Sequence, residues 1–214
     1  MNKLRLIFCG SGEFGLPTLA SLPEHGHEVI QIISQPDRPA GRGRGLAPTH
    51  ISRWAQSAGL PLLRTDNINQ ESLPGADVMV VIAFGQKIAP QIANHCRLGS
   101  INLHASRLPG LRGAAPINWS IINGDTTTGN SVIRLAQKMD AGAVLAQSEL
   151  AIGPTETAGE LHDRLAKDGP SLIAKVLDEL ATGNATERPQ DESLATAAPK
   201  LGRHSAVLDF SHSA

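Results

Sequence analysis

The stretch "DVMVVIAF", residues 77–84, decides the fold class, because all of its residues but the first are apolar. A strand that is covered on both faces, as in a parallel sheet, has this pattern. Similar runs occur at residues 4–9 ("LRLIFC"), 27–34 ("HEVIQIIS") and 99–104 ("GSINLH"). We therefore expect four buried strands in the first half of the chain.

Helical patterns alternate with these runs. They cover residues 17–23, 48–59 and 87–93, and a further helix is expected after Pro116. Alternating strands and helices predict an α/β fold with a Rossmann-like, doubly wound, mostly parallel sheet. Ligands of such sheets bind outside the carboxyl ends of the strands, so the loops that follow the four runs are expected to form the site.

The second half of the chain continues the alternation. Strand patterns occur at residues 131–136 and 143–150, and a helical pattern covers residues 157–183. Gly169 and Pro170 interrupt the helical pattern, and proline removes a helical hydrogen bond, so we expect the helix to be divided or kinked there. Beyond it the composition is that of a loop. We expect one domain over residues 1–183 and a tail or linker over residues 184–214.

Composition narrows the function classes. The chain has 214 residues, 41% of them hydrophobic and 18% charged, as in ordinary globular proteins. Its 19 basic and 20 acidic side chains nearly balance, so the overall charge does not indicate nucleic-acid binding, although a local patch can still provide it. Cys9 and Cys96 have no metal-binding spacing, and with no signal peptide they predict a cytoplasmic protein. No apolar run approaches the ~20 residues of a membrane span.

Gly10, Gly12 and Gly15 follow the first strand and match the dinucleotide-binding pattern G-x-G-x-x-G. Such a turn lets an anion sit at the N-terminus of the next helix. The pattern also needs an acid at the end of the second strand to hold the ribose, whereas this strand ends in Ser34 and Gln35. A nicotinamide- or flavin-dependent oxidoreductase is therefore an alternative, and a plain strand-to-helix turn is the simpler interpretation.

Asn102 and His104 end the fourth strand and point to the same side of it, because side chains alternate along a strand. An asparagine amide donates hydrogen bonds without losing its proton, and a histidine can donate, accept or carry charge near pH 7. The pair suits a reaction that develops an oxyanion and moves a proton, such as acyl transfer. Asp140, in the turn "KMDAG", could orient His104 and stabilise its cationic form, or could serve only to form the turn before Gly142.

The stretch that contains this pair, "INLHASRLPGLRGAAPINW" (residues 101–119), resembles the signature of the folate-dependent formyltransferases. "QPDRPAGRGRGL" (residues 35–46) makes the chain similar to the methionyl-tRNA formyltransferases within that group. "INGDTTTG", "MDAG", "AGELHDRLA" and "RPQDES" occur in the order found in the family. The resemblance covers the chain from Leu4 to about Asp209, and several long motifs in one order make it specific.

The resemblance implies that Asn102, His104 and Asp140 are catalytic, with 10-formyltetrahydrofolate as the one-carbon donor and no metal. Asn102 and His104 would stabilise the oxyanion of a tetrahedral intermediate, and one such donor is worth about 3 kcal/mol of barrier. Asp140 would hold His104 and assist proton movement. The folate would lie against two loops, formed by Phe84, Gly85 and Gln86 and by Ser106, Arg107, Leu108 and Pro109. The family recognises the pterin largely by main-chain groups, which agrees with an aromatic content of 3%.

Arg38, Arg42 and Arg44 lie in a loop rich in glycine and proline. The loop alone is compatible with a solvated segment, and also with one whose guanidinium groups grip phosphates. The resemblance implies the second: the three arginines would bind the acceptor end of initiator methionyl-tRNA, with Arg42 in the leading role. It also implies that residues 1–183 are the formyltransferase catalytic domain. Residues 184–214 would lead toward a C-terminal domain absent from this chain, and tRNA binding would be weaker without it.

The leading hypothesis is a cytoplasmic, monomeric enzyme of translation initiation and one-carbon metabolism, with no membrane attachment. It would transfer a formyl group to the α-amino group of methionyl-initiator tRNA. The nearest alternative is a formyltransferase for a small amine, glycinamide ribonucleotide or an amino sugar nucleotide, and the arginine loop argues against it. Two further alternatives are the oxidoreductase built on Gly10, Gly12 and Gly15, and a folate- or RNA-binding module without activity.

Overall fold

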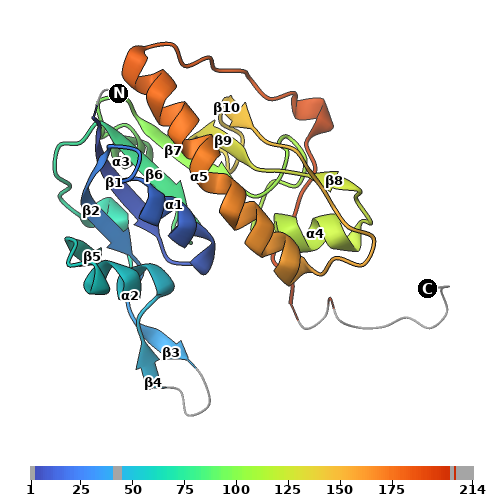
Figure 1. Ribbon diagram of the computed structural model, residues 1–214, viewed down its shortest axis with the longest axis horizontal. Helices are drawn as coiled ribbons and strands as arrows, with labels where there is room; N and C mark the ends of the chain where they lie inside the picture. Colours follow the sequence, from blue (N-terminus) through green and yellow to red (C-terminus); the bar gives the residue numbers. More distant parts are fainter. Residues whose placement is uncertain (1–2, 41–44, 203–204, 206–214) are drawn as a thin grey trace.

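The computed structural model of the chain describes residues 3–40, 45–202 and 205. A seven-stranded sheet runs through it in the order β10-β9-β7-β6-β1-β2-β5 (Figure 1). These strands are β1 (Arg5–Gly10), β2 (Glu28–Ser34), β5 (Leu62–Arg64), β6 (Val78–Ile82), β7 (Ser100–His104), β9 (Ser131–Arg134) and β10 (Val144–Gln147). Neighbours from β7 to β5 pair in parallel, whereas β9 runs antiparallel to both β7 and β10. The predicted α/β fold with a mostly parallel sheet is confirmed.

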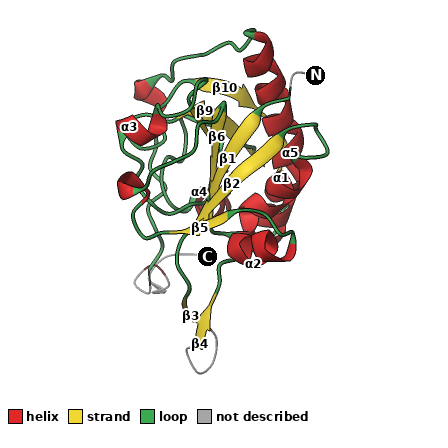
Figure 2. Cartoon of the chain, turned by 90° about the vertical axis from the view of Figure 1, so that its left-hand side faces the viewer, coloured by secondary structure: helices red, strands yellow, loops and turns green. Residues whose placement is uncertain are grey.

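Helices cover both faces of this sheet. They are α1 (Leu16–Ser21), α2 (His50–Ser57), α3 (Pro90–Ala93), α4 (Pro116–Ile122) and α5 (Ala158–Thr182), with short 3-10 helices η1 (Glu13–Gly15), η2 (Ile68–Gln70) and η3 (Glu192–Leu194). Figure 2 shows α1, α2 and α5 on one side of the sheet and α3 on the other. Across residues 3–40 and 45–202, no helix has the length and apolarity needed to span a bilayer.

The sheet is buried from both sides, as its apolar strands require. All five residues of β6 are buried, and they alternate between two cores. Val80 packs in the core beneath α1, α2 and α5, and Met79 packs in the core beneath α3. Cys9 of β1 belongs to the second core and is fully buried, and this burial raises the pKa of its thiol.

Helix α5 is longer than its sequence suggests, because it continues through Pro170 to Thr182. Thr157 and Glu160 form a capping box at its start, and Gly183 ends it in the left-handed conformation. The residue before the proline, Gly169, packs so closely that a Cβ atom there would lie 2.8 Å from both Leu103 and Thr18. The expected division of the helix is wrong, because close packing on the sheet offsets the hydrogen bond that proline removes.

Other local differences concern short strands. The arginine-rich stretch expected as a loop contains a hairpin of β3 (Arg38–Ala40) and β4 (Gly45–Ala47), which projects from the body of the molecule (Figures 1 and 2). The strand expected at residues 143–150 is split into β10 and β11 (Leu150–Ala151), which pairs with β8 (Thr127–Thr128). Strand β5 was not expected, because three residues carry too little periodicity to indicate a strand.

Candidate active site

A pocket of about 870 Å³ opens beside β1, β6 and β7, which is the size range of small-molecule and cofactor sites. The chain adds β2 and β5 on one side of β1 and later β6 and β7 on the other. Ligands of open α/β sheets bind where the strand order reverses in this way. The pocket wall includes residues 12–14 after β1, 83–88 after β6, 113–118 before and within α4, and 133–137 at and beyond the end of β9.

Strand β7 brings Asn102 and His104 to this pocket, and both line it. Parallel pairing places Asn102 beside Val81 of β6, and antiparallel pairing places His104 beside Ser131 of β9. Asn102 is partly buried, and its side-chain amide has no hydrogen-bond partner within the part of the chain that the structure describes. It therefore presents free donors to a ligand.

His104 is fixed by the loop that follows its own strand. Its side chain is 7% exposed, and Nε2 lies 2.9 Å from the main-chain oxygen of Leu111. Because a carbonyl oxygen can only accept, Nε2 carries a proton and donates it to Leu111. Nδ1 is therefore the nitrogen that remains for chemistry, and it lies 3.7 Å from Oδ1 of Asp140.

Asp140 reaches the pocket from the loop between β9 and β10. Its side chain is 13% exposed, and Oδ2 accepts a hydrogen bond of 2.9 Å from the main-chain nitrogen of Gly113. Its φ of 52° lies in the left-handed region, which a non-glycine residue adopts at a cost of about 1–3 kcal/mol unless its surroundings hold it there. The structure thus brings Asn102, His104 and Asp140 together at one pocket, the last from 36 residues farther along the chain.

The loop after β6 forms another wall, and Phe84, Gly85 and Gln86 all line the pocket. The Phe84 carbonyl accepts hydrogen bonds from Gln35 Nε2 at 2.7 Å and from Ser11 Oγ at 3.2 Å. The side-chain amide of Gln86 holds the loop in place, because it accepts a hydrogen bond from the main-chain nitrogen of Ile68 and donates one to the main-chain oxygen of Thr65. Within residues 45–202 the amide nitrogens of residues 85–88 have no hydrogen-bond partner. Main-chain donors are therefore available to a ligand here.

Residues 106–109 are not among the residues that line this pocket, although the resemblance implies that they contact folate together with the loop after β6. The Ser106 hydroxyl donates to the carbonyl of Gly110, and the nitrogen of Leu108 donates to Ser131 Oγ. Arg107 pairs with Glu149 at the surface. Leu108 and Pro109 lie between these contacts in the same loop. The main-chain amides of Ser106 and Arg107 have no hydrogen-bond partner among the described residues, so a contact of this loop with folate stays a prediction.

The glycine-rich turn after β1 is not arranged as a phosphate cradle. The amides of Ser11 and Gly12 donate to the main-chain oxygen of Ala83, at 3.2 and 3.3 Å. Helix α1 begins only after the 3-10 turn η1. The amides that would bind an anion are therefore already bonded to the loop after β6, which supports the simpler interpretation of Gly10, Gly12 and Gly15.

Of the three arginines expected to bind tRNA, only Arg38 lies within the described residues, and it is not among the residues that line the pocket. Arg38 is exposed on β3. Arg42 and Arg44 lie outside the described residues. No group of three or more His, Cys, Asp or Glu side chains suited to a metal ion occurs in residues 3–40 and 45–202.

Several pocket residues were missed in the sequence. Phe14 of η1 and His162 of α5 stack edge to face, with ring centroids 5.4 Å apart. Met139 is exposed beside Asp140, and residues 134–137 form the wall beyond β9. Met139 and residues 135–137 lie in the connection that carries Asp140, so this connection was a signal for them. His162 lies in a helical pattern for which the sequence indicated no role in the site.

Both the sequence and the fold of the chain are similar to those of known proteins. Residues 3–177 match the family described as formyl transferase. The chain is 39% identical to the methionyl-tRNA formyltransferase of Geobacter metallireducens, over 98% of this chain and 70% of that protein. It is 40% identical to the enzyme of the same name from Geobacter sulfurreducens, over 98% of this chain and 68% of that protein. A solved N-formyltransferase from Helicobacter canadensis, in complex with folinic acid and dTDP-3-aminofucose, has a TM-score of 0.70 at 14% identity, covering 97% of this chain and 73% of that one, which shows a shared fold.

Proposed function

Because the chain belongs to the formyl transferase family, we propose that it transfers a formyl group from 10-formyltetrahydrofolate to the α-amino group of methionyl-initiator tRNA. The observation that carries the proposal is the meeting of Asn102, His104 and Asp140 at one pocket. An amide donor, an imidazole and a carboxylate around one space suit transfer of a one-carbon acyl group. Relatives that carry the name of this activity align with nearly the whole chain.

The pocket fits the donor in size and in the kind of groups it presents. A volume of about 870 Å³ accommodates a folate-sized molecule. Ile88 and Leu135 offer partly exposed apolar surface, and the amides of residues 85–88 offer main-chain donors. We place the donor against Phe84, Gly85 and Gln86 and against residues 134–137. Residues 106–109 stay a predicted contact, because the amides of Ser106 and Arg107 have no hydrogen-bond partner among the described residues. When bound, 10-formyltetrahydrofolate supplies the formyl carbon.

Asn102 and His104 act on the formyl oxygen. The Asn102 amide donates to this oxygen as negative charge develops on it, and a fixed donor of this kind stabilises the transition state without reorganisation. His104 acts through Nδ1, because Nε2 is bonded to Leu111. The 3.7 Å between Nδ1 and Asp140 Oδ1 exceeds a direct hydrogen bond, so a proton on Nδ1 is presented to the substrate as well as to the carboxylate.

Asp140 keeps a negative charge beside Nδ1, which stabilises His104 when it carries a proton. It would also accept, directly or through water, the proton that the attacking amine loses. As the bond from the amine to the formyl carbon forms, the bond from this carbon to the folate nitrogen breaks, and the same proton would pass to that nitrogen as tetrahydrofolate leaves, which restores the carboxylate. Its second oxygen stays on the amide of Gly113, so the carboxylate keeps its orientation throughout.

The two buried cysteines remain the basis for the cytoplasmic location that we propose.

We assign recognition of tRNA phosphates to the hairpin with Arg38, Arg42 and Arg44. Arg42→Ala is expected to weaken use of methionyl-tRNA and to reduce the slope of log affinity against log salt by about 1, because one phosphate contact is lost. Binding of the folate donor should not change. Arg97→Ala, at the opposite end of the strands and paired with Asp77, is the matched control. Equal losses of tRNA use and folate binding would argue against the assignment.

A side-by-side assay tests the proposed substrate. The full chain is given the formyl donor with methionyl-tRNA, glycinamide ribonucleotide or an amino sugar nucleotide, and formylated products are separated and quantified. Formylmethionyl-tRNA should be the main product, and His104→Gln should abolish it while the protein stays folded in a thermal melt. Formylation of a small amine alone would overturn the substrate assignment, and product from His104→Gln at the wild-type rate would overturn the site.

A further inference from the structure

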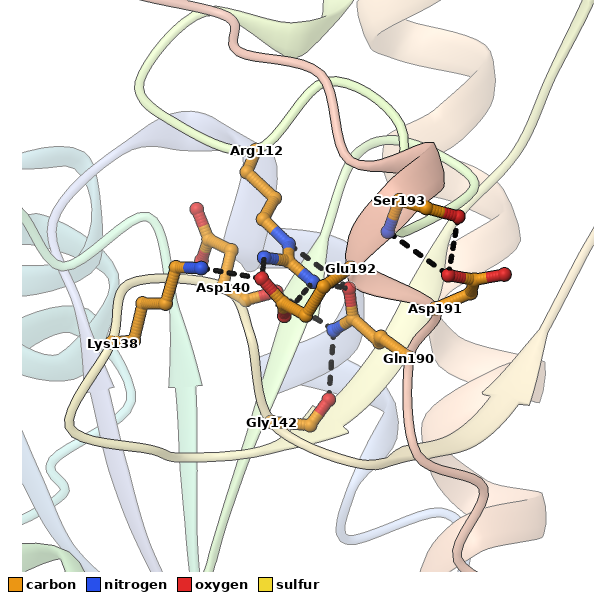
Figure 3. Close-up of polar contacts among 8 residues, drawn as sticks. All are labelled: Arg112, Lys138, Asp140, Gly142, Gln190, Asp191, Glu192 and Ser193. Carbon is orange, nitrogen blue, oxygen red and sulfur yellow. Dashed lines mark hydrogen bonds and ion pairs between the residues drawn. The ribbon is translucent and has the colours of Figure 1, made fainter.

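A buried arginine stands behind the candidate site, tied to the segment that follows α5 (Figure 3). Arg112 is 9% exposed, and its Nη2 and Nε donate to Oε1 of Gln190 at 2.7 and 3.1 Å. Its two terminal nitrogens also pair with the carboxylate of Glu192, at 2.8 and 3.1 Å. Lys138 binds the same carboxylate, and these two cations lower the pKa of Glu192 to about 2. The guanidinium is therefore held in one orientation by two residues of the distant segment.

The amide of Gln190 transmits this order to the turn that carries Asp140. Its Nε2 donates to the main-chain oxygens of Asp140 and Gly142, each at 2.8 Å. The guanidinium can only donate and the two carbonyls can only accept, so the orientation of the amide is fixed by its partners. All donors of the Gln190 side chain are thus used on the turn around Ala141, where Asp140 takes its left-handed conformation.

Main-chain contacts on the other side of Arg112 lead to both catalytic side chains. Leu111 accepts from His104 Nε2, and Gly113 donates to the carboxylate of Asp140. The Leu111–Gly113 segment is itself bonded to the segment after α5. The main-chain nitrogen of Arg112 donates to the oxygen of Thr196 at 2.8 Å, and the main-chain oxygen of Arg112 accepts from the nitrogen of Ala198. The segment after α5 therefore holds both the loop that fixes His104 and the turn that carries Asp140.

We infer that Gln190, anchored by Arg112, is a positioning residue for formyl transfer, which holds Asp140 at its working distance from His104. Gln190 does not line the pocket, so it acts through the turn and not on substrate. It also lies beyond residues 3–177, which match the formyl transferase family. A non-glycine residue in a left-handed conformation persists only where its surroundings hold it, and the two bonds from Gln190 meet this need. The inference rests on the proposed function for the reaction that it serves.

Gln190→Glu separates positioning from stability. The new carboxylate keeps an acceptor for Arg112, while its second oxygen has no proton to give to the carbonyls of Asp140 and Gly142. We expect kcat for methionyl-tRNA to fall roughly 10- to 100-fold, because displacement of a catalytic group by about 1 Å costs this much. KM for both substrates should stay near wild type, and the unfolding temperature should fall by only a few degrees, because two hydrogen bonds are a small part of the fold. Asp191→Ala is the control, because the Asp191 side chain bonds only to Ser193 among the described residues (Figure 3).

Hydrogen exchange at the amide of Gly113 provides a second readout, independent of the substrate. This amide is bonded to Asp140, so Gln190→Glu should speed its exchange and Asp191→Ala should not. A wild-type kcat, or a raised KM with unchanged kcat, would overturn the inference. If the wild-type protein formylates no tRNA, the proposed function is wrong. In that case an unchanged exchange rate at Gly113 in Gln190→Glu would still overturn the positioning role of Gln190.

If Gln190→Glu fails to fold, Glu192→Gln loosens the same guanidinium from its exposed side. Glu192 is 54% exposed, so the substitution buries no new group. We expect a smaller fall in kcat, roughly threefold to tenfold, with unchanged KM and faster exchange at Gly113, because one of the two anchors of Arg112 is weakened. Wild-type values of both kcat and exchange would overturn the inference.

Discussion

Replacing Asp140 with asparagine removes one charge from the site and keeps the shape of the side chain. Oδ1 of Asp140 lies 3.7 Å from His104 Nδ1, and Oδ2 accepts a hydrogen bond of 2.9 Å from Gly113. The single oxygen of an asparagine can keep the bond to Gly113, which turns its NH2 group toward Nδ1. The turn should therefore stay folded, while His104 loses the anion that stabilises a proton on Nδ1.

The separation sets the size of the effect. Two unit charges 3.7 Å apart attract each other by about 4 kcal/mol at an effective dielectric constant of ~20 and by about 1 kcal/mol in bulk water. Side-chain exposures of 7% and 13% place this pair nearer the first value. Each ~1.4 kcal/mol of lost transition-state stabilisation costs a factor of ten in rate, so we expect kcat to fall roughly 100- to 1000-fold.

Initial rates of formylmethionyl-tRNA formation measure this effect. KM for both substrates should change little, because an interaction made mainly in the transition state lowers kcat alone. Asp66→Asn, at an exposed acid after β5, controls for loss of a surface charge and should leave kcat unchanged. A folded Asp140→Asn protein with kcat within about threefold of wild type would refute the reasoning, since this would limit the charge to less than ~1 kcal/mol.

Two further predictions concern stability. A Cβ atom at Gly142 would lie 1.8 Å from the main-chain oxygen of Arg134, so Gly142→Ala should lower the free energy of unfolding, measured in urea, by about 3 kcal/mol. Gly75→Ala is the control and should not lower it, because Gly75 lies in open space. Equal stability of the two variants would contradict the packing. Burial lowers the pKa of His27 from its usual 6.5, so unfolding takes up a proton, and its stabilising effect is full above pH 6.5 and is lost as the pH falls below it. The urea concentration at the midpoint of unfolding should therefore decrease as the pH is lowered from about 7 to about 5. An equal decrease in His27→Gln would count against His27 as the cause.

The sheet was largely predictable from the sequence because its strands are buried on both faces. Residues 78–82 form a strand inside the predicted run, and the pairing of β9 with β10 agrees with two adjacent strand patterns. The continuous helix α5 was not predictable, because the local cost of Pro170 is visible in the sequence and the packing of Gly169 on Leu103 is not. Periodicity reports burial, and it does not report which neighbour makes the burial favourable.

The site was predictable where it depends on one strand. Alternation along β7 places Asn102 and His104 on one side, and both line the pocket. The approach of Asp140 depends on how the loop after β9 returns to the sheet, which spacing along the chain does not determine. The contact of Leu108 with folate was implied by the resemblance and stays a prediction, since Leu108 bonds to Ser131 and is not among the residues that line the pocket.

The contacts of Gln190 illustrate a further limit. The stretch around it has the composition of a loop, and the sequence offered no reason to join it to Arg112. Side-chain hydrogen bonds between distant segments leave no periodic trace, because each needs only one residue at each end. Only the structure shows that Arg112 is buried and that its charge therefore requires a partner.

Single-turnover formyl transfer by Asn102→Ala tests the central claim most directly. Asn102 lines the pocket and has no side-chain partner within residues 3–40 and 45–202, so its removal should leave the fold and the binding of the donor unchanged. With donor and methionyl-tRNA saturating, we predict a rate constant roughly 100- to 1000-fold below wild type, the usual effect of losing one oxyanion donor. A rate constant equal to that of wild type would contradict the claim that Asn102, His104 and Asp140 act together on one formyl group.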